Sequence, residues 1–432
     1  MDKVLLNHYK LMNKDIALIE FTLYSTVKTG FGTSETVYFL EIDKVHEKHS
    51  NMFPKNAPHG FNNNNLLEWI KKRKAPRNRA FIEKVFDSID DSPNPLKYVD
   101  ITHALSLNDS FWIDNDIAPT KWSSCNLYRH PFNTLLAQVA FTGYSHKISG
   151  LITSPEVTSN GAQKKCWLNR PDGIYLMKGD SFFRNSDNRN QATSEFYAAQ
   201  IAATMGIEHI NYDLEEFNHD SNSRETVCLC KLFTSEDIGF VDAYTYFKAK
   251  HLNIDNRDES DIAYHVELAN AFGLEKYEDM MVLDSLILNK DRHLGNFGFL
   301  VDNNTGKFLR PAPVFDNGYS LLCNEAVADF KKYKDDVPAL INQSPSGKFL
   351  NFDTAAKWFV QPRHIPALRK LVNFKFKRHP EPACNISEES LAVLEKVVQS
   401  RARCLLEINK EKGPHKSLRL SRSKLPDDEH QM

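Results

Sequence analysis

The chain has 432 residues, of which 41% are hydrophobic and 25% are charged, and its formal net charge is −2. This composition is typical of a soluble globular protein and excludes a strongly basic protein whose charge alone would demand nucleic acid. No apolar run is long enough to span a bilayer, and the N-terminus lacks the apolar core of a signal peptide. The seven cysteines are scattered without paired metal-ligand spacing, so we expect a cytoplasmic protein in a reducing compartment.

A chain of this length is expected to contain two or three modules. Residues 1–150 predict an N-terminal α+β module of unknown role, with strands at Ile16–Tyr24 and Thr36–Ile42 and helical material at Leu66–Lys84. The basic run Lys71–Arg79 has two interpretations, a phosphate contact or a solvated helix face, and its composition is typical of the second.

Residues 151–234 predict the strand-rich first lobe of a two-lobed fold. The small polar loop Thr158–Lys165 comes before a strand at Ile174–Lys178. A strand–loop–strand of this kind can lie over a triphosphate and offer backbone N–H groups to it. Because side chains alternate along a strand, Lys178 lies on the same face as the apolar residues before it and at the end of that face. A cation in this position suits the α- and β-phosphates. A merely exposed strand end is the alternative for this lysine.

A helix is predicted from about Ser194 to Met205, followed by a terminating glycine. Glu195, in its predicted first turn, either pairs with the strand lysine, as a helix glutamate does in kinases, or only interacts with the helix dipole. An apolar strand at Thr226–Phe233 leads into a polar hinge. Backbone groups near Cys230 and Phe233 are expected to meet the adenine edge of a nucleotide.

Residues 235–412 predict a helical second lobe whose chemistry lies in one polar loop. Asp291, His293 and Asn296 follow the apolar helical run Tyr277–Leu288. A hairpin comes next, with strands at Phe297–Val301 and Lys307–Leu309, and it leads into the sequence Phe-Asp-Asn-Gly that contains Asp316.

The hairpin is expected to bring its entrance, Asn296, and its exit, Asp316, to one point. An amide oxygen and a carboxylate, completed by substrate phosphates, are ligands that Mg²⁺ takes in phosphoryl-transfer sites. Asp291 is then placed to accept the proton of an attacking hydroxyl. Order and spacing match the catalytic-loop aspartate, the metal-binding asparagine and the second metal-binding aspartate of kinases. His293 is a further catalytic candidate in the same loop.

Helices after the hinge and strands before it predict a two-lobed α+β architecture, and residues 413–432 are predicted to be disordered. The helices predicted in the second lobe, besides the one before the polar loop, are Val241–Lys250, Asp261–Phe272 and Ser387–Lys410, the last capped by Asn385 or Ser387.

Three blocks of the sequence resemble the HipA family, bacterial serine/threonine protein kinases known from toxin–antitoxin systems. The blocks are Ser159–Lys165, Ile174–Gly179, and Asn289–Gly298 together with Phe315–Gly318. The resemblance covers about residues 150–330 and implies a kinase-like fold that uses ATP with Mg²⁺. It implies that Asp291 is the catalytic base, that Asn296 and Asp316 hold the metal, and that Lys178 binds the phosphates. The supporting loop, with Gly161, Ala162, Gln163 and Lys165, would contact the nucleotide.

Members of that family can phosphorylate a serine in their own phosphate-binding loop and so switch themselves off. The matching position here is Thr158, with Ser159 beside it, so either hydroxyl is a candidate autoinhibitory phosphosite. The resemblance also implies a protein substrate and a regulatory partner of the antitoxin type. Residues 1–150 do not visibly repeat the family's N-terminal part, so a partner-binding role is not carried over to them.

Two other functions stay open. Phosphoinositide kinases also carry a DRHxxN loop before an Asp-Phe-Gly-like triplet, although residues 317–347 lack a basic amphipathic stretch that would face a membrane. A non-catalytic regulatory protein that kept the fold is the second alternative. Every acidic and amide position that the chemistry needs is present, which favours an active kinase.

Overall fold

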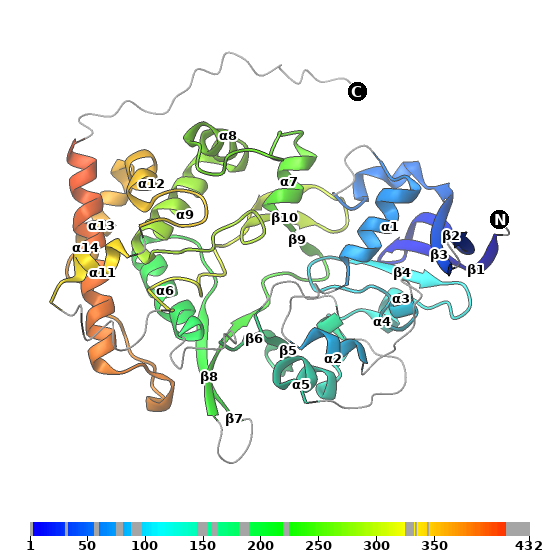
Figure 1. Ribbon diagram of the computed structural model, residues 1–432, viewed down its shortest axis with the longest axis horizontal. Helices are drawn as coiled ribbons and strands as arrows, with labels where there is room; N and C mark the ends of the chain where they lie inside the picture. The colour runs from blue at the N-terminus through cyan, green and yellow to red at the C-terminus, as the bar shows by residue number, and fades with distance from the viewer. Residues whose placement is uncertain are drawn as a thin grey trace.

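The computed structural model arranges the chain in three packed parts: an N-terminal module with its own sheet, a first lobe built on a second sheet, and a largely helical second lobe (Figure 1). It describes residues 3–30, 33–55, 60–74, 81–87, 97–144, 154–157, 163–180, 190–218, 224–324, 332, 335–343 and 345–411. The α+β, two-lobed architecture confirms the predicted fold class, while the boundaries at 150, 234 and 412 stay predictions. Within these described residues, no helix combines the length and apolar character needed to cross a membrane.

The N-terminal module is a four-stranded antiparallel sheet covered by short helices. Its strands are β1 (Val4–Asn13), β2 (Ile16–Gly30), β3 (Thr33–Val45) and β4 (Phe111–Asn115), in the order β3-β2-β1-β4. Helices α1 (Asn63–Lys72) and α3 (Lys97–Thr102) pack on this sheet, and α4 (Trp122–Cys125) packs near β4. Helix α5 (Thr134–Thr142), with α2 (Ile82–Asp87) against it, packs on the sheet of the first lobe instead. Both predicted strands are confirmed and are longer than expected, because pairing along their whole length extends them beyond the alternating residues.

The predicted helix Leu66–Lys84 is wrong at both ends. Helix α1 begins at Asn63 because the Asn62 side chain accepts the backbone N–H groups of Asn64 and Asn65. It ends at Lys72, and Arg73 follows as its C-cap. The Arg73 guanidinium is buried and pairs with Asp109 at 2.5 Å, so this part of the basic run is neither a solvated face nor a phosphate contact.

The first lobe is a second antiparallel sheet in the order β5-β6-β8-β7, with one long helix against it. The strands are β5 (Lys165–Arg170), β6 (Gly173–Lys178), β7 (Tyr212–Asn218) and β8 (Arg224–Lys231), and the helix is α6 (Gln191–Met205). Gly206 ends α6 in the left-handed conformation, as predicted. Because α6 begins at Gln191, Glu195 lies beyond its first turn, so the prediction that placed it there is wrong and the helix-dipole interpretation of Glu195 weakens.

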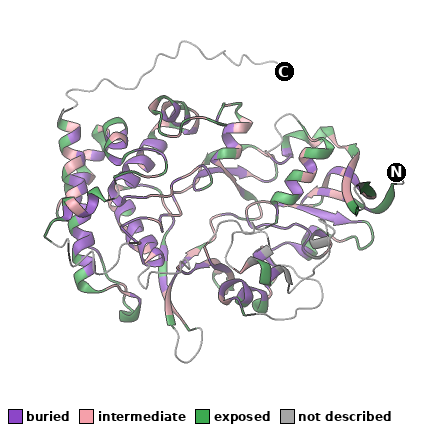
Figure 2. Ribbon diagram, in the orientation of Figure 1, coloured by how far each residue is buried: buried purple, intermediate pink, exposed green. Residues whose placement is uncertain are grey.

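The second lobe packs helices around α9, and most of its apolar side chains are buried (Figure 2). Its helices are α7 (Ala243–Ala249), α8 (Ile262–Phe272), α9 (Leu274–Ile287), α11 (Val337–Asn342), α12 (Phe352–Phe359), α13 (Ile365–Leu371) and α14 (Glu388–Glu411). Short 3-10 helices occur here and in the other parts at Glu47–Met52, Pro155–Val157, Pro362–His364 and Pro382–Cys384. Of the two caps predicted for the last helix, Asn385 and Ser387, the second is confirmed, because the Ser387 hydroxyl accepts the Ser390 backbone N–H.

The predicted hairpin is confirmed as β10 (Gly298–Asp302) and β11 (Phe308–Pro311), and it gains a third strand, β9 (Ile238–Asp242). The helix predicted from Val241 is therefore wrong at its start. Val241 pairs with Phe299, and α7 begins only after Asp242, whose side chain accepts the Thr245 backbone N–H at 2.7 Å. Asn296 lies just before β10, and Asp316 follows β11.

The N-terminal module packs against the segment that links the two lobes. The Trp122 indole N–H donates to Glu236 at 2.6 Å, and the Lys14 ammonium lies 2.6 Å from Asp237. The module also reaches the turn of the hairpin, where the Asn13 amide donates to the Asn303 carbonyl at 2.8 Å and the Asn51 amide to the Thr305 carbonyl at 3.0 Å. The module is thus fixed to the linking segment and to the hairpin of the second lobe.

Candidate active site

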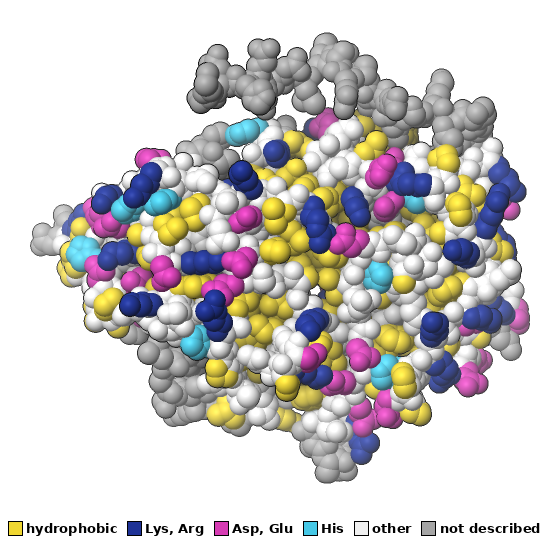
Figure 3. Space-filling model, turned by 180° about the vertical axis from the view of Figure 1, so that it is seen from behind, with side chains coloured by type: hydrophobic (Ala, Val, Ile, Leu, Met, Phe, Trp, Pro, Cys, Tyr) yellow, Lys and Arg dark blue, Asp and Glu magenta, His cyan; other side chains and the backbone are white. Residues whose placement is uncertain are grey.

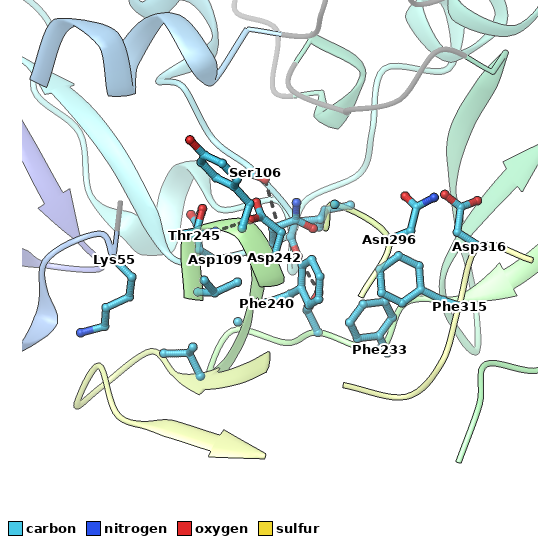
Figure 4. Close-up of a pocket in the computed structure, with 18 of the residues that line it drawn as sticks. Lys55, Ser106, Asp109, Phe233, Phe240, Asp242, Thr245, Asn296, Phe315 and Asp316 are labelled. Carbon is cyan, nitrogen blue, oxygen red and sulfur yellow. Dashed lines mark hydrogen bonds between the residues drawn. The ribbon is translucent and has the colours of Figure 1, made fainter. Parts of the chain in front are cut away.

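A cleft of about 1650 Å³ lies where the three parts meet, and each part contributes to its walls. In Figure 4 Asn296 and Asp316 lie side by side at one end of the pocket, and Lys55 of the N-terminal module lies at the other. Lys178, Asp291 and His293 line the same cleft. The residues predicted from separate sequence blocks therefore share one cavity.

The centre of the site is a buried ion cluster on Lys178. Strand β6 carries Lys178 to the edge of the cleft, where its ammonium lies 2.8 Å from Glu195 of α6 and 2.6 Å from Asp316. Lys178 and Glu195 are only 5% and 0% exposed, so the alternative of an exposed strand end is excluded for this lysine. The second oxygen of Glu195 accepts the backbone N–H of Asn317 at 2.7 Å.

Burial and pairing move the pKa values in this cluster in different directions. Burial alone would lower the pKa of Lys178, but the neighbouring Asp316 and Glu195 carboxylates raise it well above its ordinary value. Burial raises the pKa of Glu195, against the opposing effect of Lys178. For Asp316 the net effect has the opposite sign: burial acts upward, yet the Lys178 ammonium, together with Lys165 and Arg292, holds the pKa of that carboxyl well below its usual range.

The backbone around Asp316 is held in an uncommon conformation. Asp316 has a φ of +57°, in the left-handed region that costs a non-glycine residue about 1 kcal/mol. Its backbone N–H donates to the Tyr212 hydroxyl at 3.1 Å. Strained residues of this kind persist where the surroundings hold them, and they cluster at functional sites.

Asn296 is fixed through its amide nitrogen. Its Nδ2 donates to the backbone carbonyl of Asp291 at 2.9 Å, and its backbone N–H donates to the His293 carbonyl at 2.8 Å. With Nδ2 engaged in this way, the Oδ1 oxygen is the atom of Asn296 that is available as a ligand on the cleft side. Asp316 presents its carboxylate next to it (Figure 4).

Asp291 and His293 are half-buried, and the charge of each shifts the pKa of the other. Burial raises the pKa of Asp291, while the charges of His293 and Lys348 act in the opposite direction. Burial lowers the pKa of His293. The His293 Nδ1 accepts the Gly295 backbone N–H at 3.0 Å, so the neutral ring carries its proton on Nε2.

Arg292, between these two residues, was not predicted as part of the site. Its buried guanidinium binds Asp284 of α9 with two bonds of 3.0 Å and donates to the Phe315 carbonyl at 2.7 Å and to the Asn317 side chain at 2.6 Å. Arg292 therefore connects the catalytic loop to both neighbours of Asp316. The signal in the sequence was Asp284, an acid inside an apolar helix, because a buried carboxylate requires a partner.

The predicted nucleotide-binding residues fall into two groups. Gln163, Lys165, Cys230 and Phe233 line the cleft, and Lys165 lies opposite Lys178 in the register of β5 and β6. Phe233 packs on Phe315 and Phe240 with ring centroids 5.5 and 5.6 Å apart, which gives this end an apolar wall. The predicted positions Thr158, Ser159, Gly161 and Ala162 lie outside the residues that the structure describes.

The donor set fits a magnesium ion held partly by a substrate. Among the described residues, no group of three or more His, Cys, Asp or Glu side chains forms a complete metal site. Asn296 and Asp316 offer two oxygen ligands on the cleft side, and Mg²⁺ in phosphoryl-transfer sites takes one or two protein ligands together with phosphates and water. The oxygens of Asn296 and Asp316, beside the buried Lys178, therefore fit a magnesium ion that is also bound by substrate phosphates.

A family model described as the HipA-like C-terminal domain matches residues 157–372, half of the chain. Among curated proteins, the serine/threonine-protein kinase CtkA of Helicobacter pylori strain J99 is 28% identical over 161 residues, which make up 34% of this chain and 47% of that protein. The chain thus spans about half the length of the curated relative it matches.

Two solved structures are similar at low identity. The Helicobacter pylori proinflammatory kinase CtkA is 19% identical, with 58% of this chain and 91% of that chain covered and a TM-score of 0.45. HipA of Shewanella oneidensis MR-1, solved with HipB and operator DNA, is 11% identical, with 94% and 100% covered and a TM-score of 0.49. At these scores neither structure assigns a role to a residue of this chain.

Proposed function

The chain belongs to the family of the HipA-like C-terminal domain, as its motifs predicted, and from this premise we propose that it is a kinase that transfers the γ-phosphoryl group of ATP to a serine or threonine of a protein. The observation that carries the proposal is the buried Lys178 ammonium in contact with both Glu195 and Asp316, beside Asn296. A lysine paired with a helix glutamate next to an aspartate and an asparagine is the arrangement that phosphoryl transfer uses in kinases.

In the proposed reaction the acceptor hydroxyl lies beside Asp291. Its oxygen forms a bond to the γ-phosphorus, the bond from that phosphorus to the β–γ bridging oxygen breaks, and ADP leaves. The hydroxyl proton passes to the Asp291 carboxylate, whose raised pKa makes it a better proton acceptor than an ordinary aspartate. His293, neutral and with its proton on Nε2, is placed to donate a hydrogen bond within the same part of the cleft.

We assign the remaining residues by their position in the cleft. Asn296 and Asp316 would hold Mg²⁺, which when bound neutralises charge on the phosphate oxygens. Lys178, kept in place by Glu195, would bind the α- and β-phosphates, and Lys165 on the neighbouring strand adds a second cation. The adenine ring would lie near Cys230 against Phe233, with Gln163 at the phosphate side.

Further expectations from the sequence and its family resemblance stay open. Thr158 or Ser159 stays a predicted autophosphorylation site in the phosphate-binding loop, together with nucleotide contacts from Gly161 and Ala162. A regulatory partner of the antitoxin type and a cytoplasmic location also stay predictions for this chain.

The proposal is tested by the choice of acceptor. Purified protein incubated with labelled ATP and Mg²⁺ is offered a mixture of serine- and threonine-containing peptides in one reaction and phosphatidylinositol vesicles in another. Label on the peptides, recovered as phosphoserine or phosphothreonine, is the expected result. Label on the lipid alone would contradict the proposal in favour of a lipid kinase, and Mg-ATP binding without transfer to any acceptor would favour a regulatory protein.

A further inference from the structure

The cleft extends beyond the residues that would hold a nucleotide. From Asn296 and Asp316 it continues past Asp242 and Thr245 to Lys55 in the N-terminal module (Figure 4). The carboxylate of Asp242 interacts electrostatically with both Lys72 and His293, so the module and the catalytic loop face the same space. We call this region, lined by Lys55, Lys72, Asp242, Tyr244 and Lys248, the acceptor arm.

Two lysines of the N-terminal module give the acceptor arm a cationic wall. Lys55 is half-buried, its ammonium donates to the Asn51 carbonyl at 2.6 Å, and burial lowers its pKa. Lys72 is exposed at the end of α1. Within the described part of the chain, neither lysine forms an ion pair with a carboxylate. The half-buried Lys55 ammonium gains free energy when a carboxylate arrives, and the exposed Lys72 adds a second positive charge beside it.

The acids of this region are already engaged by groups of the chain itself. Asp109 is paired with Arg73 at 2.5 Å. Asp242 caps α7 through the Thr245 backbone N–H, and burial raises its pKa. Asp255 neutralises Lys248. Among the described residues that line the arm, Lys248 is therefore paired with a carboxylate, whereas Lys55 and Lys72 are cations without an ion pair.

An exposed aromatic side chain lies in the same arm. Tyr244 is 45% exposed although it lines the cleft, and its hydroxyl donates to Asp255 at 3.1 Å. Seen from behind, Lys and Arg side chains adjoin hydrophobic ones near the middle of the molecule, where the N-terminal module meets the second lobe (Figure 3). The Tyr244 ring offers apolar contact area to a peptide, and the neighbouring cations can pair with its charged side chains.

We propose that the acceptor arm binds the substrate protein as an extended segment with acidic residues next to the phosphorylated serine or threonine. Lys55 and Lys72 pair with these acidic side chains, Tyr244 packs on the peptide, and the hydroxyl reaches Asp291. The inference rests on the proposed kinase activity and names its substrate class. It also gives the N-terminal module a function, as one wall of the substrate site.

The test compares three peptides of equal length that differ only in the residues flanking one serine: aspartate, alanine or lysine. For the wild-type chain, kcat/KM is expected to be about tenfold higher with aspartate flanks than with alanine flanks, and lowest with lysine flanks. The double variant Lys55→Glu/Lys72→Glu is expected to reverse this order. Both preferences shrink as salt is raised, because the charges face solvent.

The control is the double variant Lys357→Glu/Lys370→Glu, which makes the same charge change on exposed lysines of α12 and α13, outside the cleft. It is expected to keep the wild-type order of peptides. Calorimetric affinity for Mg-ATP is measured on all three proteins, so that a misfolded variant is recognised.

Each outcome decides between the two proposals. Equal transfer to all three peptides overturns the acidic-substrate inference and leaves the kinase proposal intact. Transfer to none overturns both. If a short RNA inhibits peptide transfer in the wild type but not in Lys55→Glu/Lys72→Glu, and flanking charge has no effect, the arm binds nucleic acid and the inference is wrong.

Discussion

Glu195 and Asp316 both contact the Lys178 ammonium, yet the pKa values of these two carboxyl groups shift in opposite directions. Burial raises the pKa of Glu195, whereas the lysine keeps the pKa of Asp316 well below its usual range. Asp316 is therefore expected to be ionised at neutral pH, as the proposed metal ligand must be. Sites that push the pKa values of neighbouring acids apart assign them different tasks. The pH dependence of transfer must then arise from another group.

That group is expected to be Asp291. Burial raises its pKa above 3.8, and only the ionised carboxylate can accept a proton. We predict that kcat/KM falls as the pH is lowered through this raised pKa and is constant above it. Lys348 stabilises the ionised form, so Lys348→Glu should move the acid limb to higher pH.

Rate–pH profiles of wild type, Lys348→Glu and the exposed control Lys370→Glu check this prediction. The control should leave the acid limb in place. A limb that does not move with Lys348→Glu, or that moves to lower pH, would show that Asp291 is not the titrating base.

At the scale of elements, the site depends on how α9 is joined to the catalytic loop and to the segment after β11. Arg292 makes this connection with bonds to Asp284, Phe315 and Asn317. Sequence pattern predicted the helix, the loop and the hairpin correctly, because each has a clear apolar period or turn composition. It missed Arg292 because an arginine beside a catalytic aspartate is usually taken to face solvent or phosphate.

The variant Arg292→Lys tests the connection. Lysine keeps the charge but cannot reproduce the forked bonds, so the free energy of unfolding should fall by about 2–4 kcal/mol. Mg-ATP affinity should fall as well, because the neighbours of Asp316 lose their anchor. Arg310→Lys, in a pair with Glu208 at the surface, is the matched control and should change stability by less than about 1 kcal/mol. Equal effects of the two variants in urea denaturation would contradict this role.

The strands that were not predicted include β1, β4, β7 and β9. Strand β9 pairs with β10, where Gly298 lies opposite Asp242, and β1 pairs with β4, so both are stabilised by strands distant in the sequence, whereas β7 pairs with β8, the next strand along the chain. Such pairing extends or creates strands whose own residues carry no clear alternation. The Lys178–Glu195 pair could be predicted because kinase order links its two blocks, whereas its contact with Asp316 depends on the packing of both lobes.

At the scale of the whole molecule, the N-terminal module restrains the hinge. It contacts Glu236 and Asp237 of the linking segment and residues 303–305 of the hairpin turn. Some of these partners are almost 300 positions apart in the chain, so no local pattern could predict them. The lobes are therefore expected to move together with the module and not freely about residues 234–237.

Gly306 is the position at which this restraint can be broken with one methyl group. Its φ is +69°, and a Cβ there would lie 1.9 Å from the Asn51 carbonyl oxygen of the module. Gly306→Ala should separate the module from the turn and speed amide exchange at residues 51 and 302–306. Gly206→Ala has the same backbone strain, with φ +71° and nothing within 4 Å, and should cost only about 1 kcal/mol.

Hydrogen-exchange mass spectrometry compares the two alanine variants. Faster exchange confined to the module–turn contact in Gly306→Ala alone supports the restraint. If both variants exchange like the wild type at that contact, the module does not hold the hinge.

The most direct test of the central claim separates the two aspartates of the site. Transfer from labelled ATP and Mg-ATP affinity are measured in parallel for wild type, Asp291→Asn and Asp316→Asn. We predict that both variants lose transfer by at least about a hundredfold, that Asp291→Asn binds Mg-ATP as the wild type does, and that Asp316→Asn binds it more weakly. Undiminished transfer by Asp291→Asn, or unchanged Mg-ATP affinity in Asp316→Asn, would contradict the assignment of base and metal ligand.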